Sequence, residues 1–168
     1  MAGGGRDLRL LAGAVFLSAL GDLLAMVTLA VRVHDLTGSG FAVAGYFAAS
    51  MLPMIVLSPL AGLVADRVES VRVLVLSSLA QAAVAVALAF TADVAGLLAL
   101  SALLATGAAM SQPAEFRLVP AVAAPGGLTR ANGVVETARY VGFAVGPALA
   151  GALAAAGGPR TALLVNAA

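Results

Sequence analysis

Cysteine, lysine and tryptophan are absent from this chain of 168 residues, and histidine occurs once, at His34. Without cysteine, the chain has no disulfide framework, no thiolate metal site and no cysteine nucleophile. A single histidine cannot build a zinc site by itself. The formal net charge of +1 provides no basic surface for nucleic acid. We therefore expect no metal, no cofactor and no nucleic-acid partner.

Charged residues are also few, and apolar residues are correspondingly frequent. Charged residues make up 10% of the chain and hydrophobic residues 62%, against about 25% and 45–50% in soluble domains. A globule of this size cannot bury so much apolar surface. Disorder is excluded as well, because a disordered chain needs low hydrophobicity and high charge. The composition therefore predicts a polytopic membrane protein whose surroundings are the lipid bilayer.

Five apolar runs are long enough to cross about 30 Å of hydrocarbon, and a sixth begins near the end of the sequence. In lipid the backbone must satisfy its own hydrogen bonds, which favours helices. The first run exceeds the roughly 7–15 apolar residues of a signal peptide, which favours an uncleaved span over that alternative. We expect one all-α domain over residues 1–168, a transmembrane helical bundle with five full spans and an incomplete sixth: Leu10–Val31, Phe41–Ala65, Val73–Ala92, Val94–Ala114, Ala131–Gly158 and Thr161–Ala168.

The segment between the fourth and fifth runs is predicted to be an irregular connector. Residues 115–130 include Pro120, Pro125 and the pair Gly126-Gly127, which are typical of loops. This assignment places Glu115 and Arg117 outside the membrane, so Asp22, Glu136 and Arg139 are the three charged residues expected within spans.

The arginines are distributed unevenly between the two sides of the predicted bundle. With the N-terminus inside, six arginines are cytoplasmic and two lie outside, which matches the positive-inside rule. The six are Arg6, Arg9, Arg67, Arg72, Arg117 and Arg130; the two are Arg32 and Arg160. We therefore expect a cell membrane protein, inner or plasma, with a cytoplasmic N-terminus. Arg32 is close in sequence to Asp35, with which local pairing is expected.

Ionisable residues at membrane depth are costly, and each is a functional hypothesis by default. Asp22 is 12 residues into the first run, roughly 18 Å along a helix axis and near the midplane. It could exchange a proton or meet a cationic substrate, or it could form an interhelical ion pair or hydrogen bond. Glu136 and Arg139 share one helix face, where a structural ion pair is favoured over an anion contact or a pair with Asp22.

The loop between the second and third runs carries the most informative motif: Gly62, then Asp66-Arg67, then Arg72. Gly62 would permit close helix approach, and Asp66 could accept backbone N–H groups at a helix N-terminus. This spacing resembles the loop signature of the major facilitator superfamily. The loop departs from the general pattern at two positions: Glu69 stands where the pattern has glycine, and Val71 where it often has a basic residue. Asp-Arg followed by an acidic residue and then an arginine is nonetheless similar to the branch that includes the enterobactin exporter.

A second motif lies in the fifth run and includes Gly142, Gly146, Pro147 and Gly151. It resembles the motif that the superfamily associates with exporters and antiporters, although Ala150 replaces one glycine. Gly142 and Gly146 form a small-xxx-small face for close packing, and Pro147 is expected to bend the helix. Gly21-Asp22, residues 36–39, Leu52-Pro53, Pro113-Ala114 with Pro120, and Ala131-Asn132 extend the resemblance from about Leu10 to Asn166.

The resemblance implies a secondary transporter that rocks two six-helix halves around a central site. This chain would be a fragment supplying the N-terminal half, would lack the C-terminal half, and would export a small molecule. The loop Gly62, Asp66, Arg67 and Arg72 would be a conformational latch, with Asp22, Glu136 and Arg139 as cavity or proton-relay residues. Leu103 stands where drug/proton antiporters of the family often carry an arginine, so the resemblance supplies no proton-coupling residue there.

Two other classes of function are conceivable for a membrane protein of this composition: an intramembrane enzyme and a membrane scaffold. An intramembrane enzyme needs a paired nucleophile and base or a metal cluster, and the scattered carboxylates with a loop-placed His34 provide neither. A small membrane scaffold or assembly subunit without transport activity remains the alternative. The sequence does not specify the substrate: amphipathic drugs, siderophores and many metabolites would suit such a cavity.

Overall fold

The computed structural model describes residues 4–167, and the predicted positions 1–3 and 168 lie outside them. The described part contains five helices and no strand: α1 Gly4–Thr37, α2 Gly40–Arg67, α3 Ser70–Phe90, α4 Val94–Val122 and α5 Leu128–Ala167. All five are long and apolar enough to cross a membrane. The all-α transmembrane bundle expected from the sequence is confirmed.

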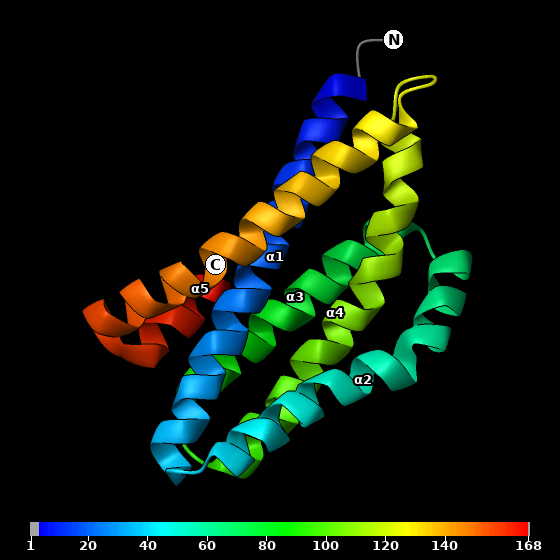
Figure 1. The fold of residues 1–168 in the computed structure, drawn as a ribbon. Helices are drawn as coiled ribbons and strands as arrows, with labels where there is room; N and C mark the ends of the chain where they lie inside the picture. The colour runs from blue at the N-terminus through cyan, green and yellow to red at the C-terminus, as the bar shows by residue number, and fades with distance from the viewer. Residues whose placement is uncertain (1–3, 168) are drawn as a thin grey trace.

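The helices alternate in direction along the chain (Figure 1). The start of α1 and the α4–α5 connection lie at one end of the bundle, and the α1–α2 and α3–α4 connections lie at the other. The most extensive packing joins α1 to α5, and α2 to α4. One core cluster is centred on Leu29, Leu88 and Leu97, and a second joins Val15 of α1 to Val135 of α5.

The helix boundaries follow local capping chemistry. Ser39 accepts a hydrogen bond from the backbone N–H of Ala42 at the start of α2, and Asp93 accepts one from Gly96 at the start of α4. Such caps satisfy backbone donors that the first turn leaves unpaired. In α2, Pro53 and Pro59 lie inside the helix. Each removes a backbone donor, and the helix bends along its length (Figure 1).

The fifth and sixth predicted runs form one element interrupted at Gly158, whose backbone is at φ 80° and ψ 174°. Glycine adopts this conformation readily because it has no Cβ. The chain then turns back, so the segment that ends at Ala167 lies beside α1 (Figure 1). Pro147 also lies inside α5, but the non-helical backbone within the described α5 is at Gly158. The sharp change of direction therefore falls at the glycine.

The predicted connector over residues 115–130 is wrong at both ends, because α4 extends into it and α5 begins at Leu128. Helix α4 continues to Val122 through both Pro113 and Pro120, so the connection spans only residues 123–127. A proline inside a helix removes one hydrogen bond and bends the helix without having to end it. As a consequence, Glu115, which was expected outside the membrane-spanning runs, is buried within α4 at 5% exposure.

Candidate functional site

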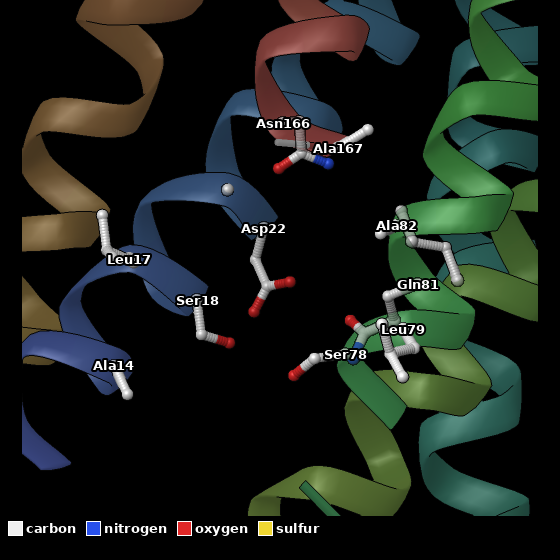
Figure 2. A pocket seen from close by; sticks show the side chains of 12 residues that line it. Ala14, Leu17, Ser18, Asp22, Ser78, Leu79, Gln81, Ala82, Asn166 and Ala167 are labelled. Atoms are coloured by element: carbon white, nitrogen blue, oxygen red, sulfur yellow. The ribbon is translucent and has the colours of Figure 1, made fainter. Parts of the chain in front are cut away.

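A cavity of about 390 Å³ lies between α1 and α3, with Asp22 on its wall. In Figure 2 the Asp22 side chain points from α1 into this space, with Ser18 beside it on the same helix. Ser78 and Gln81 face it from α3, and Asn166 reaches it from the end of α5. The remaining lining residues are mainly apolar: Ala14, Leu17, Gly21, Leu79, Ala82, Leu104 and Ala167. An apolar cavity with a few convergent polar groups is typical of a small-molecule site.

Two glycines allow the polar side chains to reach the cavity. A Cβ placed on Gly21 would collide with the amide oxygen of Asn166, so only a glycine leaves room for that side chain there. A Cβ on Gly107 of α4 would lie 2.5 Å from Cγ of Gln81. Asn166 and Gln81 were not among the residues predicted from the sequence, because neither belongs to a recognisable motif.

A buried charge cluster lies next to the cavity. The Arg139 guanidinium donates to Glu115 at 3.0 Å and to Glu136 at 3.4 Å. The side chains of Arg139 and Glu115 are only 12% and 7% exposed, against 37% for Glu136. Arg139 also lies over the Phe116 ring, 5.5 Å from its centre. The structure therefore brings the predicted pair Glu136–Arg139 together and adds Glu115 as the more deeply buried partner.

Asp22 belongs to the same electrostatic group. It interacts through space with both Glu115 and Arg139, whereas the ion pairs of Arg139 within the described residues are with Glu115 and Glu136. Two carboxylates, one from α4 and one from α5, thus pair with one guanidinium, and a third carboxylate on α1 interacts with this pair through space. In a low-dielectric interior such charges interact strongly, so the position of Arg139 is sensitive to the charge of each carboxylate.

The loop motif joins α2 to α4. Asp66 lies in the last turn of α2, and its Oδ1 accepts from Arg117 Nη1 at 3.1 Å. Both side chains are well exposed. The predicted capping role of Asp66 at the next helix is wrong, since Glu69 is the N-cap of α3 and makes no side-chain cap hydrogen bond. Asp66 cannot cap α3 because it is still inside α2.

The other motif residues of this loop lie at the surface. Arg72 pairs with Glu69 at 3.0 Å, within one helical turn, and Arg67 is exposed. Gly62 does not provide the close helix approach expected of it, because a Cβ placed there would have no neighbouring heavy atom within 4 Å. Among the described residues, the motif contributes the contact Asp66–Arg117 between α2 and α4.

The glycines of α5 lie against α1. A Cβ on Gly142 would be 2.6 Å from the carbonyl oxygen of Phe16, and one on Gly146 would be 2.7 Å from that of Leu20. Both glycines are buried, whereas Gly151 is exposed and has open space around it. Gly142 and Gly146 thus permit α5 to approach the backbone of α1 closely. Gly151 has no such contact among the described residues.

Metal-ligating residues do not gather anywhere in residues 4–167. No group of three or more histidine, cysteine, aspartate or glutamate side chains there is arranged to hold a metal ion. The carboxylates near the cavity are instead arranged around Arg139.

These features define a class of protein: a bundle of helices long and apolar enough to span a membrane, with a largely apolar cavity that contains a few polar groups and with a charged contact between α2 and α4. The family model described as Major Facilitator Superfamily matches residues 11–168. The chain belongs to the major facilitator superfamily, and it is a multi-pass membrane protein of a family of transporters rather than enzymes. No curated protein matches the chain.

Proposed function

We propose that this chain is the N-terminal half of a secondary transporter that exports a small molecule by alternating access. In such transporters the substrate site lies between two halves that rock against each other. Five helices and the start of a sixth correspond to one half. In this proposal the chain is a fragment, and the missing C-terminal half of the transporter completes the substrate site. The exporter-type motif of α5 supports export as the direction of transport, and it supports membership of the enterobactin-exporter-like branch.

The observation that carries the proposal is the Asp22 cavity. It combines one carboxylate with uncharged polar side chains from two other elements at the centre of an otherwise apolar bundle. An acidic group at membrane depth is costly, and such a residue is therefore a functional hypothesis by default. A cationic or amphipathic small molecule would complement this lining, with Asp22 as its charged contact.

Proton coupling through Asp22 and the Arg139 cluster is a further part of the proposal. Asp22, Glu115 and Glu136 outnumber the one cation with which they interact. Uptake of a proton by one carboxylate would bring the cluster closer to neutrality, and its release would free a carboxylate for a cationic substrate. In this proposal a proton and a cationic substrate would compete for the carboxylate of Asp22.

The contact between Asp66 and Arg117 would act as the conformational latch. It joins α2 to α4 at one end of the bundle, and a contact made in only one access state biases the equilibrium between states. The excess of arginine at the end that holds the N-terminus supports a cytoplasmic position for this contact in a cell membrane protein, under the positive-inside rule.

Replacing Asp22 by asparagine tests the cavity. We expect efflux of the fluorescent cation ethidium, catalysed by the product of the complete gene in membrane vesicles, to fall by about tenfold, since a hydrogen bond to a charged group contributes about 1.5–3 kcal/mol. The residual efflux should lose its dependence on pH between 6 and 8. The matched control is Asp35→Asn, the same change on an exposed residue of α1. Unchanged efflux with unchanged pH dependence in Asp22→Asn would overturn Asp22 as the coupling residue.

Replacing Asp66 by asparagine tests the latch. The pair with Arg117 is exposed, so its loss should change stability by no more than about 1 kcal/mol, and membrane insertion should be normal. Ethidium efflux should still fall about two- to fivefold, because the balance between access states shifts. Glu69→Gln is the control, since it breaks an equally exposed ion pair that stays within one turn. A latch role is refuted by equal efflux rates in wild type and Asp66→Asn.

The coding sequence beyond Ala168 separates the transporter from the alternative of a membrane scaffold. A continuation of about 200 residues that encodes a second set of spans, with a loop of the Asp-Arg type, agrees with a transporter of two halves. A stop codon directly after Ala168 would favour a scaffold or assembly subunit.

A further inference from the structure

The second cavity of the molecule contains two arginines and no acidic residue. It has a volume of about 270 Å³ and is lined by Arg32, Ala89, Phe90, Pro159 and Arg160. It lies where α1 and α3 approach their C-terminal ends and where the chain resumes its helix after Gly158. In sequence these arginines are 128 positions apart, and they are the two that the charge distribution assigns to the side opposite Arg67 and Arg72.

Arg32 is held in place by backbone carbonyls. Its Nη1 donates to the Leu88 carbonyl oxygen at 2.8 Å, and its Nη2 donates to the Thr91 carbonyl oxygen. The expected local pair with Asp35 is wrong, because the guanidinium is turned toward the C-terminal end of α3 instead. Carbonyl groups orient a guanidinium without neutralising it, and a guanidinium has five N–H donors. Arg32 therefore keeps a full positive charge and unused donors.

Arg160 is positioned by an aromatic ring. Its guanidinium carbon lies 4.2 Å from the centre of the Phe90 ring, within the range of a cation–π contact. Stacking uses the face of the guanidinium and leaves its N–H groups at the edge available for an anion. Pro159, the residue before it, begins the last helical segment, and the N-terminal end of a helix also favours negative charge.

The charges of these two arginines are not balanced locally within the described residues. The ion pairs there join Arg72, Arg117 and Arg139 to carboxylates, and none includes Arg32 or Arg160. The nearest acidic residues in sequence do not line the cavity: Asp35 is exposed on α1, and Asp93 accepts the Gly96 amide at 2.6 Å as the cap of α4. Two uncompensated guanidinium groups around one cavity are a recognition element for phosphate or carboxylate.

We propose that this cavity binds a phosphate anion, with Arg32 and Arg160 donating to its oxygens. Two sources offer that chemistry at the end of a membrane-spanning bundle: the headgroup of an anionic phospholipid, and a free phosphate. The site is separate from the Asp22 cavity and does not depend on the transport proposal.

The test uses the product of the complete gene, purified in detergent, and native mass spectrometry with three probes. The probes are dioctanoyl phosphatidylglycerol, dioctanoyl phosphatidylcholine and inorganic phosphate. We expect phosphatidylglycerol to be retained and phosphatidylcholine not, and Arg160→Gln to weaken retention by about tenfold, because the change removes a charged hydrogen-bond donor. Retention of inorganic phosphate, competing with phosphatidylglycerol, would assign the site to a soluble anion instead of a headgroup.

Two further variants keep the test independent of folding. Arg32→Gln should weaken retention as Arg160→Gln does, but it also removes the hydrogen bonds from Arg32 to the C-terminal end of α3. Arg160→Lys avoids this difficulty. It keeps the positive charge but lacks the planar set of guanidinium donors, and it should retain phosphatidylglycerol better than Arg160→Gln does. Arg130→Gln, an exposed arginine at the other end of the bundle, is the matched control and should bind as wild type does. The proposal is overturned if Arg160→Gln retains phosphatidylglycerol as wild type does, or if neither phosphatidylglycerol nor inorganic phosphate is retained.

Discussion

Replacement of Arg139 by methionine is expected to lower the free energy of unfolding by about 3–5 kcal/mol, the cost of leaving a buried charge without its partner. Arg139 is the guanidinium that faces Glu115 at 3.0 Å, and both side chains are almost fully buried. Methionine fills a similar length but offers no charge, so the Glu115 carboxylate would remain in the interior with its desolvation uncompensated. The measurement is unfolding in mixed micelles followed by circular dichroism, since the chain has no tryptophan.

A double variant distinguishes the loss of charge pairing from the loss of packing. Arg139→Met combined with Glu115→Leu removes both charges and should recover most of the lost stability, because well-packed apolar residues often replace a buried pair at little cost. Arg117→Met is the surface control: its pair with Asp66 is exposed, and the expected loss is about 1 kcal/mol or less. Equal losses for Arg139→Met and Arg117→Met would show that the buried pair is not the source of the effect.

Replacement of Gly142 by leucine is expected to be the second large effect, with a loss of about 3 kcal/mol, at the upper end of what overpacking costs. A Cβ at this position would lie 2.6 Å from the Phe16 carbonyl oxygen and 2.9 Å from the Leu20 amide nitrogen. These are backbone atoms of α1, which cannot rotate away as a side chain can. The two helices would have to separate along this contact.

Gly151→Leu provides the matched control for this prediction. It makes the same change in the same helix, but Gly151 is exposed and has no neighbouring heavy atom within 4 Å of a Cβ. Leucine is also a better helix former than glycine by up to about 1 kcal/mol, so this variant should be as stable as wild type or more so. If Gly142→Leu unfolds at the same denaturant concentration as Gly151→Leu, the close approach of α5 to α1 does not hold the bundle together.

The sequence was most informative where the physical cause is local. Apolar runs such as Phe41–Ala65 have to form helices in lipid because their backbone has no other partners, and the structure has a helix at each of them. The pair Glu136–Arg139 follows from a spacing of three residues on one helix. The small residues Gly142 and Gly146 follow from their spacing of four, which places them on one face.

The sequence was least informative about secondary structure in the segment where a proline and charged residues are close together. Pro120 and Glu115 together were interpreted as a connector, and the structure shows that α4 continues through both. A proline weakens a helix by one hydrogen bond, and neighbouring helices can compensate for that loss in a bundle. Burial of Glu115 depends on Arg139, which is 24 positions away, so no local pattern could reveal it.

By itself, the sequence determined that this protein is a bundle of membrane-spanning helices, and it located Asp22, Glu136 and Arg139 within them, because hydropathy and helical period act over a few turns. Only the tertiary structure decided which charges meet. It joined Arg139 to Glu115, Asp66 to Arg117, and Arg32 to the end of α3. These partners are 24 to 56 positions apart, and contacts at such separations depend on how the helices pack against one another rather than on the residues next to each charge.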